Sequence, residues 1–487
     1  MITRSARWLV AGTGSLQERV LRSGVWLLAG DGAARAAGLL KVVILGRLLS
    51  PSDFGLMGVA VVLLGWLDYF TQTGISAALI QWPGTIGTYL DAAWTIQVLR
   101  GAGLAAIIAA VAPLWARFFE TPAAVDLIRV AALVPLLRAF VNPAVVYLRK
   151  EVDFRREVLW RLSGVTAGLV VAIPAAFAWR NAWALVLSVV AAQAVETACS
   201  YWIEPYRPRL RADVAQMREL FLLGRWFFWS NIVSFVGLQL DSLGVGKILG
   251  ATALGFYQMA HQLAFLPASQ LGTHVQGVIF PAFSKLAAVV DLRRALFRTL
   301  TLVASAVIPV ALFLTLFADP VVLLVLGEKW RPIAPVVKAL AWAGAAAALT
   351  KVTGPLLQAA GRPELQVHAS AQETLVLAVL LYPLMKAFGI SGAALALLVA
   401  ALWLLAVQGA MVARLFGPIG DEVLRVMKAA GLCSSPFLVV APVVPLSAPR
   451  SLRVLAAASL TAYLGILAIV VWSQVRRQPT LPSATRT

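Results

Sequence analysis

Five basic residues lie inside long apolar stretches of the chain, where an unpaired charge is costly. Arg35, Arg100 and Arg138 stand near the middle of their stretches, and Lys41 and Lys351 lie in two further places of the same kind. A guanidinium group holds a phosphate through two parallel hydrogen bonds. We therefore predict that these residues face a cavity of mainly positive charge, which suits an anionic ligand.

Polar residues accompany these cations at helical spacing. Asp31 lies four residues before Arg35, and Asn142 lies four residues after Arg138, so each pair shares one helix face. Amides in the second half of the chain repeat at the same spacing, and interhelical hydrogen bonding explains those amides as well as ligand contact does. The predicted substrate-binding set is Arg35, Arg100, Arg138, Lys351, Lys41, Asn142, Asn231, Gln258 and Gln262.

The elements that position these residues are membrane-spanning helices. Hydrophobic residues make up 60% of the 487 residues and charged residues 13%, which leaves too little polar surface for a soluble protein. Apolar runs of about 20 residues, long enough to cross a bilayer, follow one another with short polar joints. We predict an all-α integral membrane protein with fourteen helices, at 24–46, 54–80, 89–115, 123–147, 158–178, 182–203, 219–246, 254–283, 299–326, 335–359, 367–388, 391–415, 423–446 and 451–473.

Two segments 200 residues apart look like copies of one another. GRLLSPSDFGLMGVA at 46–60 and GKILGATALGFYQMA at 246–260 share the glycines at 46/246 and 55/255, the leucine at 49/249 and the alanine at 60/260. Duplication in so apolar a chain is typical of transporters whose two lobes rock about a site at their interface. We expect a cytoplasmic segment at 1–22, a six-helix N-lobe at 23–216, a six-helix C-lobe at 217–418, two further helices at 419–474 and a cytoplasmic tail at 475–487.

The loops on one side of the predicted helices carry more Lys and Arg than those on the other. With Arg161 counted among the loop residues, the division is 25 against 11. Positive charge marks the cytoplasmic side, so both termini are expected in the cytoplasm. The net charge of +19 then reflects this bias and contact with anionic lipid headgroups rather than nucleic-acid binding.

Several kinds of catalytic and cofactor site are missing from the sequence. It has no GxxxxGK[ST] loop for ATP, no HExxH or GxSxG motif, and no loop long enough for a soluble catalytic domain. The three histidines are scattered singly, and Cys199 and Cys433 both fall in predicted helices. We expect neither an enzyme, nor a metal site, nor a cofactor.

Four sequence segments resemble the polysaccharide-transporter family of lipid-linked oligosaccharide flippases. They are GLLKVVILGRLLSPSDFGLMGVA after Arg35, YLRKEVDFRRE, LGFYQMAHQLAFLPASQLGTHVQGVIFPAFSKL and PLLQAAGRPELQ. The likeness runs from about residue 20 to residue 420, and the superfamily also holds multidrug exporters of the MATE type and the peptidoglycan-precursor flippase. The family's basic position in the first helix corresponds to Arg35.

The resemblance implies a bacterial inner-membrane protein with two pseudo-twofold related six-helix bundles around a central cavity. It implies a substrate of undecaprenyl diphosphate carrying an oligosaccharide repeat, which is flipped to the periplasmic leaflet for exopolysaccharide, capsule or lipopolysaccharide O-antigen assembly. Membrane lipids and a polysaccharide polymerase are the expected partners. The last two helices match no motif of the family, and only analogy with the peptidoglycan-precursor flippase gives them a lipid-tail groove.

Two other functions stay open. A MATE-like antiporter of organic cations would need a cavity dominated by carboxylates and aromatics, which the buried arginines disfavour. A membrane glycosyltransferase or ligase would need a longer outward loop. Because there is no ATP site, transport must be driven by an ion gradient or by consumption of the product. The candidates for ion coupling are the acidic residues in apolar stretches: Asp31, Asp68, Glu196 and Asp241.

Overall fold

The protein is all-helical in the part that the structure describes. This structure is a computed structural model, and it describes residues 16–71, 79, 86–151, 153–210, 239–265, 289–359, 362–440 and 461–470. Within these ranges there is no strand, and eight helices are long and apolar enough to cross a membrane. The chain is therefore a multi-pass membrane protein, and the count of fourteen helices stays a prediction.

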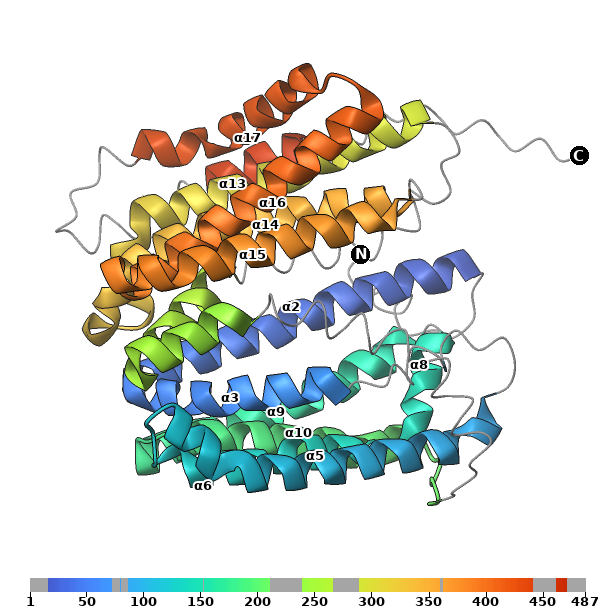
Figure 1. The fold of residues 1–487 in the computed structure, drawn as a ribbon. Coiled ribbons are helices and arrows are strands. Elements are labelled where there is room, and N and C mark those ends of the chain that lie inside the picture. Colours follow the sequence, from blue (N-terminus) through green and yellow to red (C-terminus); the bar gives the residue numbers. More distant parts are fainter. Residues whose placement is uncertain are drawn as a thin grey trace, which may run out of the picture. The chain divides into compact units, whose positions relative to one another are not determined.

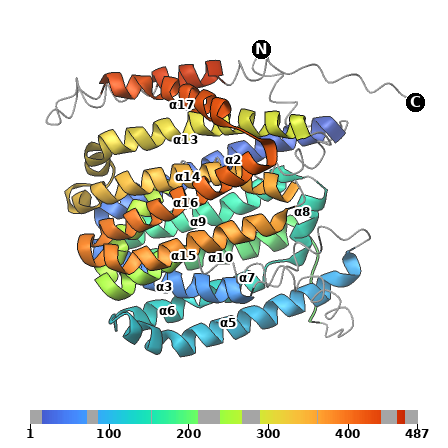
Figure 2. The ribbon, with the colours of Figure 1, turned by 45° about the horizontal axis from the view of Figure 1, so that its top comes forward.

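The chain divides into two compact units, of which the first holds residues 1–239 and 246–255. Its long helices are α2 (Leu16–Leu48), α3 (Pro51–Thr71), α5 (Leu90–Phe118), α9 (Phe154–Trp179) and α10 (Trp183–Ile203). Helix α9 packs beside both α2 and α10 (Figures 1 and 2). Gly164, Gly168 and Ala172 recur every four residues on the buried face of α9. Such small residues let the α10 backbone come close, with Ser188 and Ala192 directly opposite.

The predicted span 123–147 is not one continuous helix. It is divided into α6 (Ala124–Ala131), α7 (Leu133–Ala139), the 3-10 turn η2 (Pro143–Val145) and α8 (Val146–Lys150). Pro143 lacks the N–H that a continuing helix would need, and Asn142 is extended, with ψ at 118°. The break corrects the expected position of Arg138, which lies in the last turn of α7 and not in mid-helix.

Helix α2 is longer than the predicted first span, because it begins at Leu16 inside the segment expected to precede it. Helix α3 begins at a capping box, in which the Ser50 backbone N–H donates to Asp53 Oδ2 at 2.9 Å and the Asp53 N–H donates to Ser50 Oγ at 3.3 Å. Pro51 occupies the first helical position, where no hydrogen bond is lost. The α2–α3 corner is thus determined by its own sequence.

The two duplicated segments touch each other in a reciprocal way within the first unit. A Cβ on Gly55 would collide with the backbone carbonyl of Ala251, and a Cβ on Gly255 would collide with that of Pro51. The tenth position of each copy therefore meets the sixth position of the other. A twofold rotation between two copies of a segment produces contacts of this kind.

The second unit holds residues 240–245 and 256–487. Its labelled elements are α13 (Val289–Val325), the 3-10 turn η3 (Glu328–Ile333), α14 (Ala334–Ala359), α15 (Pro363–Phe388), α16 (Ile390–Phe416) and α17 (Gly420–Val440). Helix α14 lies beside both α13 and α16, and α17 packs on α13 (Figure 2). The short helix Thr461–Val470 is fastened to α13, where the Tyr463 hydroxyl donates to the Ala306 carbonyl at 3.0 Å.

Several predicted spans fall partly or wholly outside the described residues. Spans 219–246 and 254–283 are described only over 239–246 and 254–265, and span 451–473 only over Thr461–Val470. The predicted lobe boundary at 216/217 lies among residues that the structure does not describe. The domain boundaries accordingly stay predictions.

Candidate functional site

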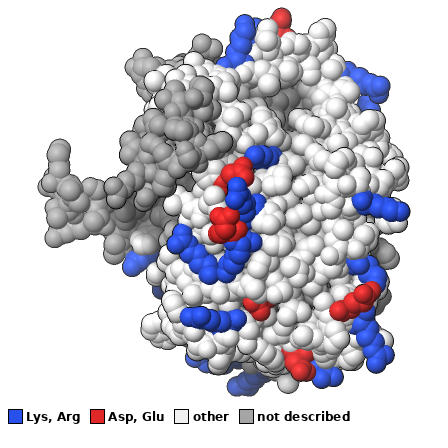
Figure 3. Space-filling view, turned by 90° about the vertical axis from the view of Figure 1, so that its left-hand side faces the viewer, with Lys and Arg blue, Asp and Glu red and all other residues white. Residues whose placement is uncertain are grey.

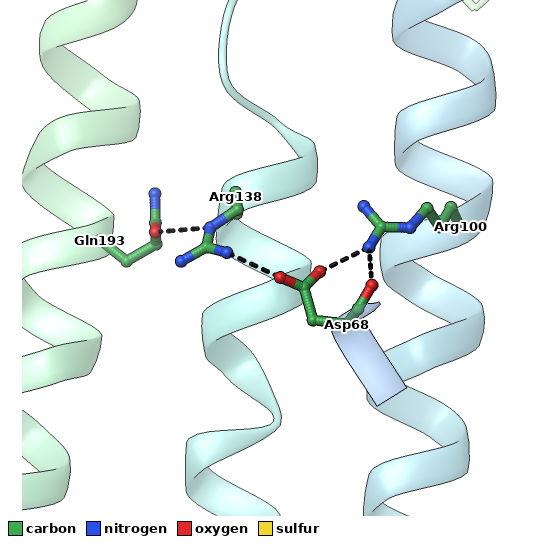
Figure 4. Close-up of polar contacts among 4 residues, drawn as sticks. All are labelled: Asp68, Arg100, Arg138 and Gln193. Carbon is green, nitrogen blue, oxygen red and sulfur yellow. Dashed lines mark hydrogen bonds and ion pairs between the residues drawn. The ribbon is translucent and has the colours of Figure 1, made fainter. Parts of the chain in front are cut away.

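Asp68, near the C-terminal end of α3, joins two arginines of the predicted site (Figure 4). Its Oδ1 accepts a hydrogen bond from Arg100 Nη2 at 2.5 Å, and its Oδ2 accepts one from Arg138 Nη1 at 3.1 Å. Arg138 Nε also donates to Gln193 Oε1 at 3.3 Å. Side chains from α3, α5, α7 and α10 therefore meet in one polar cluster inside apolar helices.

A second carboxylate in the same unit also joins two arginines. Asp31 Oδ1 accepts a hydrogen bond from Arg161 Nη2 at 2.9 Å, and Arg35 Nη2 lies 3.8 Å from Asp31 Oδ2. The sequence analysis counts Arg161 with the loops, whereas the structure places it about two turns inside α9. The pair thus connects α9 to the face of α2 that carries Arg35.

Glu196 is a third carboxyl near these clusters, because it follows Gln193, the partner of Arg138, by three residues on α10. It projects from α10 next to Gly164 of α9. Lys41 belongs to the same unit, and its Nζ donates to Ser188 Oγ at 3.1 Å. Four guanidinium groups against three carboxylates leave the group net positive, and Lys41 adds to that charge.

Exposure differs between the charges of opposite sign. The side chains of Arg138 and Arg161 are 56% and 40% exposed, whereas those of Asp68 and Asp31 are 24% and 11% exposed. Each carboxylate is therefore less exposed than one of the two arginines that it holds, Arg138 for Asp68 and Arg161 for Asp31. A ligand that approached this group would meet guanidinium groups first.

Asn142 lies apart from this charged group and is fully buried. Its Nδ2 donates to the carbonyls of Glu204 and Tyr206, both at 2.9 Å, and its Oδ1 accepts from the Ala144 backbone N–H at 3.1 Å. Its own backbone N–H donates to Ser200 Oγ at 2.9 Å. These contacts hold the chain that leaves α10 against the break between α7 and α8, so Asn142 is occupied by structural hydrogen bonds.

The chain that follows α10 is also hydrogen-bonded to α5. Tyr206 Oη donates to Asp91 Oδ1 at 2.7 Å, and the Arg209 backbone N–H donates to that oxygen at 2.9 Å. Burial, followed by the bond to Asp91, raises the pKa of Tyr206 to about 12, so the hydroxyl keeps its proton at neutral pH.

Asp241 in the second unit is buried in a polar group of its own. Its Oδ2 accepts from Tyr257 Oη at 2.7 Å, and its Oδ1 accepts from the Ser242 backbone N–H at 2.7 Å. His261, one turn after Tyr257, stacks on Phe265 with ring centroids 4.1 Å apart. Sequence reasoning named Asp241 but not its tyrosine and histidine neighbours.

The other predicted residues of the second unit are scattered over several helices. Lys351 is half-buried on α14, Gln258 is half-buried and Gln262 exposed on the helix at 251–265, and Asn231 lies outside the described residues. The structure also shows a carboxyl that the sequence analysis did not name: Glu373, half-buried on α15.

A buried amide network in the second unit was also missed. Gln408 Nε2 donates to Gln366 Oε1 at 2.8 Å, the Thr353 hydroxyl bonds Gln408 Oε1, and Gln366 Nε2 donates to Ser370 Oγ at 3.3 Å. These contacts connect α14, α15 and α16. They fit the role of polar groups that bind helices together in a membrane.

Sequence reasoning found Arg35, Arg100 and Arg138 but missed Arg161 and Gln193. Arg161 lies inside the predicted span 158–178 and Gln193 inside 182–203. A polar side chain within an apolar span was therefore the signal that could have found both residues. The described residues contain no group of three or more His, Cys, Asp or Glu side chains placed to hold a metal ion. The chemistry that the charged group offers is reversible binding of an anion.

Comparison with known proteins connects the sequence to polysaccharide export. Residues 44–335 match the family described as "Polysaccharide biosynthesis protein". The lipopolysaccharide biosynthesis protein WzxC of Escherichia coli K12 is 25% identical over 363 residues, which is 74% of each chain. The succinoglycan biosynthesis transport protein ExoT of Rhizobium meliloti is 26% identical over 308 residues, 62% of this chain and 61% of that one.

Solved structures show the same fold at low sequence identity. The lipid II flippase MurJ in an inward closed conformation aligns with a TM-score of 0.75 and 14% identity, covering 93% of this chain and 100% of that one. An inward-facing MATE transporter of the MOP superfamily aligns with a TM-score of 0.60 and 15% identity, covering 81% and 95%. Because the family match covers more than half of the chain, the protein belongs to this polysaccharide biosynthesis family, and it has the fold of MOP-superfamily flippases and exporters.

Proposed function

We propose that the protein is a flippase for an undecaprenyl-diphosphate-linked oligosaccharide. It moves the repeat unit from the cytoplasmic to the periplasmic leaflet of the bacterial inner membrane, where the unit enters exopolysaccharide, capsule or O-antigen assembly. It performs no covalent chemistry. The observation that carries the proposal is the group of four arginines on α2, α5, α7 and α9, two of which, Arg138 and Arg161, are more exposed than the carboxylates that hold them.

This arrangement suits a diphosphate that must cross hydrocarbon. Moving two or more negative charges through lipid is strongly unfavourable, and guanidinium groups in a wet cavity reduce that cost by direct pairing. The glycan brings its own hydroxyls and needs water or polar side chains, whereas the isoprenoid tail stays in lipid. Arg138 and Arg161 are the residues that would contact the diphosphate, with Arg35, Arg100 and Lys41 close by in the same unit.

We propose that three residues of the second unit also bind the substrate, with Lys351 as a cation for its negative charge and Gln258 and Gln262 as contacts for sugar hydroxyls. Alternating access between two duplicated lobes is the expected mechanism. The glycine contact between the copies at 46–60 and 246–260 supports the duplication on which this mechanism depends.

Charge separates this function from a cation antiporter. A site for organic cations would present carboxylates outward, but here Asp31 and Asp68 lie beneath arginines. Because both aspartates already neutralise arginines, Asp241 with its Tyr257 and His261 neighbours is the better candidate for ion coupling.

Export by a strain that lacks the chromosomal gene tests the proposal. Complementation with the wild-type gene should restore surface polysaccharide, and R138A or R161A should reduce it at least about ten-fold, since each removes one charge-assisted contact. Lysine at either position should restore only part of it because the planar fork is lost. R129A is the matched control, because Arg129 is an exposed arginine paired with Asp126 in the same unit. Normal export by both alanine variants would contradict the proposal.

A further inference from the structure

Asp31 and Asp68 occupy equivalent places in two similar clusters. Each carboxylate uses one oxygen for one guanidinium and the other oxygen for a second guanidinium. For Asp68 both partners come from other helices, and for Asp31 one partner comes from α9. An anion with two or more oxygens could take over either pair of arginines in the same way.

The two arginines of each cluster also differ from each other. The more exposed members, Arg138 and Arg161, reach the surface of the unit, whereas Arg100 and Arg35 are 22% and 29% exposed. Glu196 on α10 lies beside Gly164, which follows Arg161 by three residues on α9. Gln193, the partner of Arg138, precedes Glu196 by three residues on α10. One ligand in that place could therefore contact Arg138 and Arg161 together.

We propose that Asp31 and Asp68 are internal counter-ions that compete with the substrate diphosphate for the arginines and so lower its affinity to a level that allows release. The inference rests on the proposed function, because it takes the diphosphate as the ligand of this site. In the empty protein the aspartates neutralise guanidinium groups that would otherwise be costly to hold between apolar helices. When the diphosphate binds, Arg138 and Arg161 turn from their aspartates to the phosphate oxygens.

Competition of this kind answers a requirement that every carrier has. Four arginines without counter-ions would bind a di- or trianion with high affinity, because hydrogen bonds between ionised groups are strong and a low local dielectric makes them stronger. A ligand held so firmly would leave slowly, since affinity differences among related complexes lie mostly in the dissociation rate. Retaining the aspartates lowers affinity and raises the release rate together.

The test measures binding of inorganic pyrophosphate to the purified full-length protein by calorimetry. D68N and D31N remove one negative charge each with almost no change in shape, so each should bind pyrophosphate at least about ten-fold more tightly than the wild type. The double variant D68N/R100Q restores the charge balance and should return affinity to within about three-fold of the wild type. D126N is the control, because Asp126 is an exposed surface aspartate paired with Arg129, and it should bind as the wild type does.

Flipping provides the second readout. D68N and D31N should move lipid-linked substrate more slowly than the wild type even though they bind pyrophosphate more tightly. Unchanged or weaker pyrophosphate binding by both variants would overturn the counter-ion role. The role would also be overturned if neither variant folds, whether or not pyrophosphate is present. A wild type that flips normally beside such variants leaves the proposed function standing. If the aspartate variants bind pyrophosphate more tightly but the wild type flips no lipid-linked substrate, the proposed function is refuted and the counter-ion role is kept.

Discussion

Side chains of the same chemical type have different roles in this molecule, and their surroundings decide which. Arg138 and Arg161 are more exposed than the aspartates that they pair with, whereas Arg149 is held by two hydrogen bonds to the buried carboxylate of Glu157, at 2.9 and 2.7 Å. Asn142 satisfies three backbone groups and is buried, so its amide has a structural use that its helical spacing from Arg138 did not indicate.

Replacing Asn142 with alanine should destabilise the protein by about 2 kcal/mol, because a helix cap and two buried hydrogen bonds are lost together. Heating purified protein and following the folded fraction by size-exclusion chromatography should show a lower Tm. Asn181 is the control, since its Oδ1 accepts only from the Trp183 backbone N–H, at an exposed turn, and N181A should lower the Tm less. An N142A variant of unchanged Tm that no longer exports polysaccharide would return Asn142 to the substrate-binding set.

The bounds of a helix were predictable where the length of an apolar run sets them, and less predictable where hydrogen bonds between distant residues set them. Spans 158–178, 182–203 and 391–415 correspond to α9, α10 and α16 within a few residues. Span 123–147 is mainly apolar and has the right length, but Pro143 and the hydrogen bonds of Asn142 divide it. The tertiary partners of Asn142 are distant in the sequence, so its pattern could not show the break, and Arg138 was therefore placed in mid-helix.

Helix α3, which begins at Pro51, contacts the helix at 251–265 through Gly55 and Gly255. This contact gives a prediction for α3. Gly55→Ala should destabilise the protein, since its Cβ would collide with the Ala251 carbonyl. Gly65→Ala on the same helix meets nothing within 4 Å and should stabilise it by up to about 1 kcal/mol through helix propensity. Gly255→Ala should behave as Gly55→Ala does, because the contact is reciprocal. Equal Tm values for G55A and G65A would contradict the contact.

Charges on the whole molecule are distributed unevenly between the predicted sides. Basic residues assigned to the outer side are often paired: Arg129 with Asp126, Lys247 with Glu120, and Lys338 with Asp319, at 3.1–3.4 Å. Figure 3 shows such mixing of acidic and basic side chains on one face of the molecule. The positive-inside rule counts Lys and Arg rather than net charge, so these pairs leave the predicted orientation resting on the division of 25 against 11.

Cysteine labelling in intact cells tests that orientation. In a chain with Cys199 and Cys433 replaced by serine, E120C and E328C should react with a membrane-impermeant maleimide, whereas E151C should react only after lysis. All three glutamates are exposed in the structure, so reactivity depends on the side of the membrane. Reaction of E151C in intact cells would reverse the topology.

Transport of a diphosphate lipid by the purified protein tests the central claim most directly. Vesicles that contain the full-length protein and a fluorescent undecaprenyl-diphosphate oligosaccharide would be treated with an impermeant quencher, and the rate at which inner-leaflet lipid becomes accessible would be measured. The account predicts fast exchange with the wild type and with R129A, and exchange no faster than in protein-free vesicles with R138A/R161A. Wild-type vesicles that exchange the lipid no faster than protein-free ones would contradict it.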